Sequence, residues 1–340
     1  MLERLPRPLA LLVLGLFLLG AAWCFVAPTV RPDGAVGNEY TDLMLFRDVT
    51  ARVAQGVPYH QAAAELQREH GYPLHPFFTM REPALSVLAA RLGWGAMQGL
   101  AMGLAVAALL VWTRALVPLV SRAERIASLA GLALGALALA NQGLLVGTEP
   151  WVGLLLTLAL ACRLRGWPWA EVLVIGTALL LRELALPYAL LALAFALVQR
   201  DRAAAFRWIG VLAVFAGAMA IHAHFVAQVV RPEDLPSQGW SGGQGLRGFL
   251  MGVAYTSVWQ VLPQPIAMLL ALLPGLGWLA LPGRSAWFAQ LLLGGYALML
   301  MLFSRSDNFY WGFTVLPMWF IGYALLPRAA RQLARAISSG

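Results

Sequence analysis

The 340-residue chain contains no lysine, only two cysteines and few charged residues, which make up 12% of the sequence against 60% for hydrophobic residues. Because a soluble domain carries about 25% charged residues, this composition excludes an ordinary water-soluble surface. All 24 basic residues are arginines spread through short polar segments, with no basic run that would bind nucleic acid. Cys24 and Cys162 fall near opposite membrane faces of the spans predicted below, so neither a disulfide nor a metal cluster is expected.

Long apolar runs dominate the rest of the sequence and suit a bilayer core about 30 Å thick. We predict an all-α, polytopic integral membrane protein, a single domain over residues 1–340 with about ten transmembrane helices. The predicted spans cover residues 7–27, 94–116, 125–142, 150–164, 169–182, 184–199, 208–229, 264–282, 286–303 and 310–327. Fourteen of the 24 arginines then lie on one side, which the positive-inside rule makes cytoplasmic, together with both termini. Arginine in place of lysine, with many Ala, Gly and Leu, is typical of a GC-rich bacterial genome and predicts the bacterial cytoplasmic (inner) membrane.

The outer side of this arrangement receives 12 of the 16 acidic residues. Acidic residues contribute little to topology, so the positive-inside rule does not explain why they gather on one side. A reactive or binding face on that side would explain it. The largest outer segment, residues 28–93, is predicted to lie on the membrane and to carry short amphipathic or interfacial helices. These helices are expected at residues 42–55, 58–70 and 84–92, with Thr41 capping the first.

Three of the predicted spans, between residues 150 and 199, are about 15 residues long, below the usual length of about 20. Short, proline-interrupted helices are tolerated where they line a cavity rather than lipid, which predicts a water-accessible cavity on the outer side. Arg182 and Glu183 lie at the outer turn between two of these helices, where charges usually face a cavity or a partner. We predict that both bind substrate, with a structural ion pair as the alternative, and that Glu149 joins the same cavity.

Three carboxylates, Glu39, Asp42 and Asp48, follow the first span closely and lie near the membrane surface. Asp42 is the candidate general base toward an incoming hydroxyl, and Glu39 and Asp48 are candidate substrate contacts beside it. Glu39 and Asp42 are three positions apart, so they share a face if the helix extends back to Glu39. The alternative is that these acidic residues only stabilise the first turn of a helix.

Arg81 and Glu82 lie where the chain re-enters the membrane, and Arg305 lies in the outer sequence SRSDNFYWG. For the first pair, a binding rim for a phosphate or a sugar competes with an interfacial ion pair. For Arg305, an aromatic belt with loop charges is the simpler interpretation. The outer carboxylates offer oxygen ligands for a divalent cation, but no spacing requires one. His222 and His224 fall on nearly opposite helix faces, which argues against a metal pair.

Several short motifs follow one another in the first part of the chain. An acidic residue, Asp42, follows the first span, and the sequence GVPY then ends at Tyr59. The sequence REP begins at Arg81, in a place where a Tyr-Pro-Pro type of sequence is commoner. The sequence NQ begins at Asn141. This order resembles the GT-C superfamily of membrane glycosyltransferases. More narrowly, it is similar to the bacterial branch that uses polyprenyl-phosphate-linked mannose or related sugars, with GVPY in the place of its G-x-P-Y signature. The resemblance covers residues 38–200.

The resemblance implies an enzyme of the cell envelope in which Asp42 takes a proton from an acceptor hydroxyl, whose oxygen attacks the anomeric carbon while polyprenyl phosphate leaves. It implies a polyprenyl-phosphate-linked sugar donor, a glycan or lipid acceptor, and surrounding membrane lipids. Tyr59 becomes a candidate substrate contact, and Arg81, Arg182 and Arg305 are candidates to stabilise the leaving phosphate. Two other classes stay open: a membrane transporter or flippase, which would show charges nearer mid-membrane and an internal repeat, and a non-catalytic envelope-assembly partner.

Overall fold

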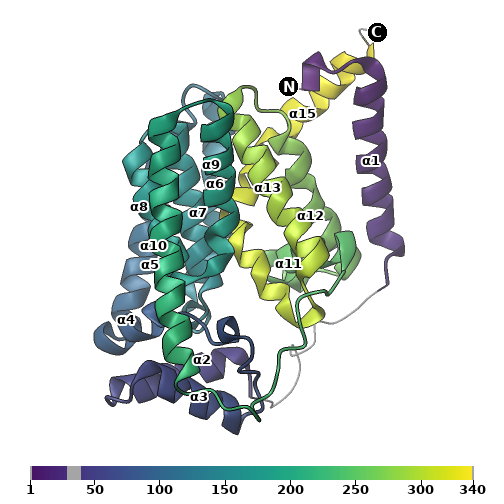
Figure 1. The fold of residues 1–340 in the computed structure, drawn as a ribbon. Coiled ribbons are helices and arrows are strands. Elements are labelled where there is room, and N and C mark those ends of the chain that lie inside the picture. Colours follow the sequence, from purple (N-terminus) through teal and green to yellow (C-terminus); the bar gives the residue numbers. More distant parts are fainter. Residues whose placement is uncertain (1, 29–39, 339–340) are drawn as a thin grey trace.

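The computed structural model describes residues 2–28 and 40–338, and within them the chain forms helices and no β-strand (Figure 1). The first half contains η1 (Leu2–Arg4), α1 (Arg7–Val26), α2 (Asp42–Ala54), α3 (Tyr59–Glu69), η2 (Phe77–Thr79), α4 (Ala84–Leu92), α5 (Trp94–Ala115), α6 (Arg122–Gly135), η3 (Leu137–Ala140), η4 (Leu144–Val146), α7 (Glu149–Leu164) and α8 (Pro168–Leu181). The second half contains η5 (Glu183–Ala185), α9 (Leu186–Val198), α10 (Arg202–Ala227), α11 (Gly245–Tyr255), η6 (Val258–Val261), α12 (Gln264–Trp278), α13 (Arg284–Phe303), η7 (Ser306–Thr314), α14 (Leu316–Trp319) and α15 (Ile321–Ser338). The all-α prediction is confirmed.

Four helices of the described chain are long and apolar enough to cross a membrane: α1, α5, α10 and the Ala286–Phe303 part of α13. A fifth candidate is the pair formed by η7 and residues 316–338, which is bent by 66°. Helices also lie at the other predicted spans, but α8, α9 and α12 are shorter. The membrane character of the chain is therefore supported, whereas the count of ten spans is not established.

The short helix α7 forms the centre of the bundle. Every residue from Glu149 to Cys162 is buried, and α7 packs against α5, α8 and η7. Gly153 permits one of these approaches, because a Cβ there would overlap the carbonyl oxygen of Phe313 on η7. Small residues allow such close contacts between membrane helices. Since protein rather than lipid surrounds α7, the bilayer thickness does not set its length.

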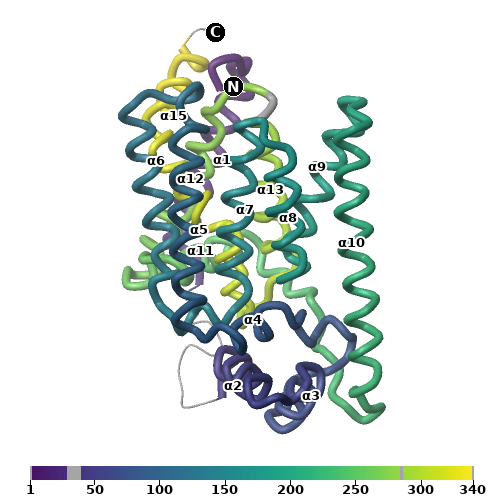
Figure 2. The backbone as a smooth tube through the Cα atoms, turned by 90° about the vertical axis from the view of Figure 1, so that its left-hand side faces the viewer, coloured from purple at the N-terminus to yellow at the C-terminus, as the bar shows by residue number. Residues whose placement is uncertain are grey.

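The segment after α1 folds into a layer of short helices at the end of the bundle away from both termini. Helix α2 packs against α3 and α4, and both views place this layer below the long helices (Figures 1 and 2). Thr41 caps α2 as predicted, since its hydroxyl oxygen accepts a hydrogen bond from the Met44 amide (3.4 Å). Gly56 ends this helical unit with φ +93°, a conformation that favours glycine. The three predicted helices of this segment are confirmed.

One element of the bundle was not predicted. The predicted spans 208–229 and 264–282 leave residues 230–263 between them as a loop, but α11 lies within this segment, and its residues from Phe249 to Ala254 are buried. Helix α11 packs against α12, α13 and η7. At 11 residues it is too short to count as a span, and it ends beside the cavity described next.

Candidate functional site

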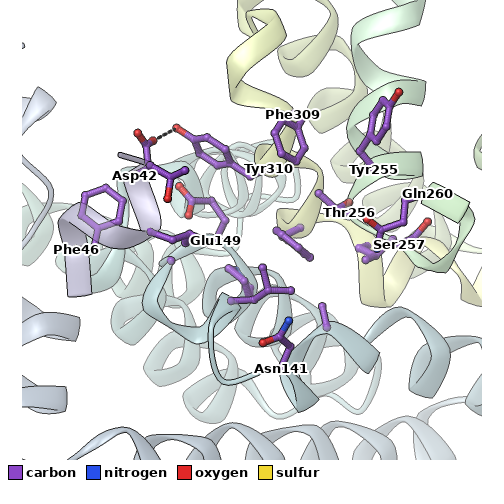
Figure 3. Close-up of a pocket in the computed structure, with 18 of the residues that line it drawn as sticks. Asp42, Phe46, Asn141, Glu149, Tyr255, Thr256, Ser257, Gln260, Phe309 and Tyr310 are labelled. Carbon is purple, nitrogen blue, oxygen red and sulfur yellow. Dashed lines mark hydrogen bonds between the residues drawn. The ribbon is translucent and has the colours of Figure 1, made fainter. Parts of the chain in front are cut away.

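A cavity of about 660 Å³ lies where the layer of short helices meets the bundle (Figure 3). Its walls come from α2, the segment joining α6 to α7, the α11–η6 turn and η7. The lining side chains that carry polar groups are Tyr40, Thr41, Asp42, Tyr72, Arg81, Asn141, Glu149, Tyr255, Thr256, Ser257, Gln260, Asp307 and Tyr310. The apolar lining comes largely from Leu134, Leu137, Leu144, Phe309, Phe313 and Leu316. A ligand of this cavity would therefore meet charged, neutral polar and apolar groups.

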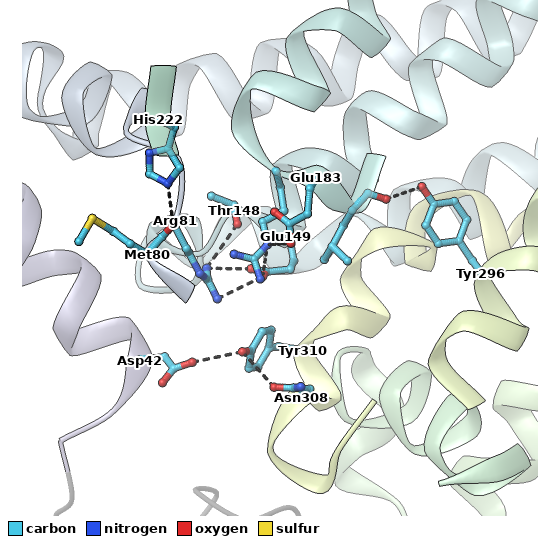
Figure 4. A network of polar contacts seen from close by, with 12 residues as sticks. Asp42, Met80, Arg81, Thr148, Glu149, Glu183, His222, Tyr296, Asn308 and Tyr310 are labelled. Atoms are coloured by element: carbon cyan, nitrogen blue, oxygen red, sulfur yellow. Dashed lines mark hydrogen bonds and ion pairs between the residues drawn. The ribbon is translucent and has the colours of Figure 1, made fainter. Parts of the chain in front are cut away.

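Asp42 lies in the first turn of α2, at the cavity wall. Its Oδ2 accepts a hydrogen bond from the Tyr310 hydroxyl of η7 (3.2 Å; Figures 3 and 4). Because the Thr41 side chain caps the helix, the Asp42 carboxylate is not needed as the cap. An acidic residue in the first turn still interacts favourably with the helix dipole, so both interpretations of Asp42 are compatible with its position.

Arg81 supplies the positive charge of the cavity. Its Nη1 donates to Glu149 Oε2 (3.2 Å) and to Thr148 Oγ1 (3.3 Å), and its Nη2 lies 3.2 Å from Glu149 Oε1. The guanidinium also stacks 3.9 Å from the centre of the Phe46 ring. Only 8% of the Arg81 side chain and 2% of the Glu149 side chain are exposed. A buried arginine–carboxylate pair of this kind is held in one orientation.

The backbone beneath Arg81 is fixed by a second set of polar contacts. The Tyr59 hydroxyl donates to the Arg81 carbonyl (2.7 Å), and His222 Nε2 lies 2.9 Å from the Met80 carbonyl (Figure 4). A carbonyl only accepts, so His222 carries its proton on Nε2 and its Nδ1 accepts from His60 Nε2 (3.1 Å). Both rings are then neutral. Burial, together with the neighbouring His222 ring, lowers the pKa of His60 to about 4.

Behind the cavity, Arg182 lies among three glutamates, Glu149, Glu183 and Glu82. Arg182 Nε lies 3.6 Å from Glu149 Oε1 and 3.4 Å from Glu183 Oε1. Both carboxyl oxygens of Glu82 are buried and have no hydrogen-bond partner among the described residues. Burial, and then the nearby charge of Glu183, raise the pKa of Glu82 to about 8. Burial therefore favours the protonated form of Glu82. Arg182 meets carboxylates rather than lipid.

The structure brings some of the predicted site residues together and separates others. Asp42, Arg81 and Glu149 line the cavity. Tyr59 and the group at Glu82, Arg182 and Glu183 lie outside its lining and contact residues near it. Glu39 lies outside the described residues, so its predicted contact with substrate stays a prediction.

Asp48 and Arg305 also lie outside the cavity lining. Asp48 Oδ2 accepts from the Tyr40 hydroxyl (2.6 Å). Arg305 pairs with Asp307 (Nε–Oδ1 3.0 Å, Nη2–Oδ2 2.6 Å) and donates to the Gly239 carbonyl (2.8 Å). Among the three arginines considered for a leaving phosphate, Arg81 is thus the one that reaches the cavity.

Several residues at the cavity were missed by the sequence analysis. Tyr310 was assigned to an interfacial aromatic belt, but its neighbours Trp311 and Phe313 are buried. Gln260 and the adjoining turn come from α11–η6, whose signal in the sequence was an apolar run at 249–254 preceded by glycines. The described residues contain no group of three or more His, Cys, Asp or Glu side chains that could hold a metal ion.

Fold and cavity together define an all-helical protein with helices suited to crossing a membrane and a charged cavity at one end of the bundle. Comparisons with protein-family models, with curated proteins and with solved structures found no match for this chain. Its activity therefore has to be argued from the cavity itself.

Proposed function

We propose that the protein is a membrane glycosyltransferase of the GT-C type. It transfers a sugar from a polyprenyl-phosphate-linked donor to an acceptor hydroxyl on the outer face of the bacterial cytoplasmic membrane, and both its termini are cytoplasmic. The observation that carries the proposal is the shared cavity of Asp42 and Arg81, a carboxylate and a guanidinium that approach the same space from α2 and from the segment before α4. A ligand in this cavity meets a base and a cation at once.

In the proposed reaction the Asp42 carboxylate takes the proton of the acceptor hydroxyl, and the acceptor oxygen attacks the anomeric carbon. A new carbon–oxygen bond forms there as the bond to the donor phosphate breaks, and polyprenyl phosphate leaves with the bonding electron pair. Negative charge grows on the phosphate during this step. A guanidinium fixed in advance stabilises that charge more in the transition state than in the ground state, and this is the role of Arg81.

The contacts of Glu149 explain how Arg81 can serve an anionic ligand. In the structure Glu149 already neutralises Arg81, so a phosphate would share or replace that contact. Glu149 also lies near Arg182, so it keeps a second cationic neighbour when a phosphate shares the Arg81 guanidinium. The apolar lining beside the charged wall suits the first part of a lipid chain.

The test is a transfer assay with the purified protein in lipid nanodiscs. Radiolabelled polyprenyl-phosphate mannose and related donors are supplied with glycan and lipid extracts, and release of polyprenyl phosphate is measured with transfer of label. Turnover by the wild type that is lost in Asp42→Asn supports the proposal. Absence of turnover with every donor, or transport of intact labelled lipid across proteoliposomes, contradicts it, and the second result indicates a flippase.

A further inference from the structure

The contact between Tyr310 and Asp42 joins two distant parts of the chain, 268 positions apart. The Tyr310 hydroxyl has one proton and two acceptors within reach, Asp42 Oδ2 at 3.2 Å and Asn308 Oδ1 at 3.3 Å. A hydrogen bond to an ionised carboxylate is stronger than one to a neutral amide, so the proton belongs to the Asp42 contact. Asn308 is buried on the same 3-10 helix, and its side chain lies beside the Tyr310 hydroxyl (Figure 4).

The segment that carries Tyr310 is tightly held. Trp311 and Phe313 are buried, and a Cβ on Gly312 would overlap the Gly252 carbonyl of α11. The Tyr310 ring also lies 5.7 Å from the Arg81 guanidinium, so Tyr310 lies close to both Asp42 and Arg81. A stiff aromatic side chain on a packed segment can therefore fix the direction of a carboxylate on the layer of short helices.

Two hydroxyl groups bear on the direction of the Asp42 carboxylate, those of Tyr310 and Tyr72. Thr41 provides the cap of α2, and the Tyr310 contact joins Asp42 to the bundle. Burial, the Asp42 charge and a hydrogen bond with the Asp42 side chain raise the pKa of Tyr72, a second phenol of the cavity wall. The Tyr72 hydroxyl also donates to the Tyr40 carbonyl just before α2 (3.2 Å), so Tyr310 is the one of these two phenols that comes from the bundle. A general base acts efficiently only when it is held within hydrogen-bonding reach of the proton that it removes.

We propose that Tyr310 is a positioning residue that holds the Asp42 carboxylate toward the acceptor hydroxyl. Residues 306–314, from the second half of the chain, then complete a site to which the first half contributes Asp42, Arg81 and Glu149. The inference rests on the proposed transferase function, because it assigns Tyr310 a part in proton removal by Asp42.

The test compares Tyr310→Phe with Tyr296→Phe in the nanodisc assay. Each substitution removes one hydroxyl that donates a hydrogen bond, but the Tyr296 hydroxyl donates to the Leu184 carbonyl (2.7 Å) outside the cavity lining. We expect Tyr310→Phe to lower kcat roughly tenfold with an unchanged donor KM, because a misaligned base slows the chemical step. Tyr296→Phe should lower thermal stability while leaving kcat near the wild-type value.

A double variant separates positioning from a structural role. If Tyr310 acts through Asp42, adding Tyr310→Phe to Asp42→Asn should cause no further loss of kcat. An active wild type whose kcat is unaffected by Tyr310→Phe, or a double variant slower than Asp42→Asn alone, overturns the inference and leaves the transferase proposal standing. A wild type inactive with every donor overturns both.

Discussion

Gly153 of the central helix and Phe313 of the cavity segment pack so closely that a Cβ on Gly153 would overlap the Phe313 carbonyl oxygen. Phe313 itself lines the cavity, three positions after Tyr310. The most buried helix of the bundle is thus in direct contact with the segment that completes the candidate site, and the shape of the site depends on a glycine.

Gly153→Ala should destabilise the protein by about 1–3 kcal/mol, the usual cost of overpacking a tight core. We expect the apparent Tm, followed by tryptophan fluorescence in detergent, to fall by several degrees. Gly103→Ala on α5 is the matched control, because a Cβ there has no neighbour within 4 Å. Its Tm should stay level or rise, since alanine favours a helix over glycine. Equal Tm values for the two variants would contradict the packing at Gly153.

Glu82 predicts a specific pH dependence of stability. Its pKa is raised to about 8, chiefly by burial, from an ordinary value of 4.5, so the folded state binds a proton that the unfolded state releases. The contribution of this bound proton to the free energy of unfolding is fully present below about pH 4.5 and is lost as the pH rises through about 8. Relative to Glu82→Gln, which resembles the protonated side chain, wild-type Tm should therefore fall between about pH 5 and pH 8. A difference in Tm that does not change with pH would show that Glu82 is ionised throughout.

The predicted orientation can be tested by labelling single cysteines with a membrane-impermeant maleimide. Gln61 and Ser338 are both exposed, whereas native Cys24 and Cys162 are buried and should give little background. We expect Gln61→Cys to react in intact cells and Ser338→Cys to react only after permeabilisation. Labelling of both sites from the same side would refute the predicted topology, and with it the outer location of the cavity.

Local signals account for what the sequence predicted well. Thr41, Gly56 and Pro58 mark the ends of α2 and α3 through capping and turn chemistry that acts within a few residues. Asp42 was predicted because it follows the first span closely and because the resemblance selects its position, and Arg81 because it lies where the chain re-enters the membrane. These features need no knowledge of the tertiary fold.

Long-range packing accounts for what was missed. The contact of Tyr310 with Asp42 and the position of Gln260 depend on how η7 and α11 pack against α2 and α7, which apolar periodicity does not encode. Arg305 shows the opposite case, since its charge suggested a substrate contact but is taken up by Asp307, two residues away. The charged groups can thus be recognised in the sequence, whereas the contacts between them depend on the tertiary fold.

Arg81→Lys should weaken use of the donor. Lysine keeps the charge but lacks the planar fork that reaches two oxygens at once, so we expect the donor KM to rise roughly tenfold. Arg305→Lys is the matched control, since Arg305 forms a similar two-point pair with Asp307 but itself lies outside the cavity lining. Its donor KM should stay within about twofold of the wild type. Similar increases in both variants would remove Arg81 from phosphate recognition.

Asp42→Asn is the decisive substitution for the mechanism. Base catalysis typically contributes about 10²–10⁴-fold, so turnover should fall at least about a hundredfold. Asparagine can still accept the Tyr310 hydrogen bond, and Thr41 still caps α2, so Tm should change little. Asp48→Asn makes the same change in charge on the same helix, at a carboxylate that accepts from Tyr40 and lies outside the cavity lining. Because a proton can be taken only by a base that reaches the cavity, Asp48→Asn should retain most of its turnover. A stable Asp42→Asn protein with nearly full activity would instead leave Asp42 with the role of an acidic first-turn residue. An equal loss of turnover in Asp42→Asn and Asp48→Asn would point to the net charge of α2 rather than to proton transfer.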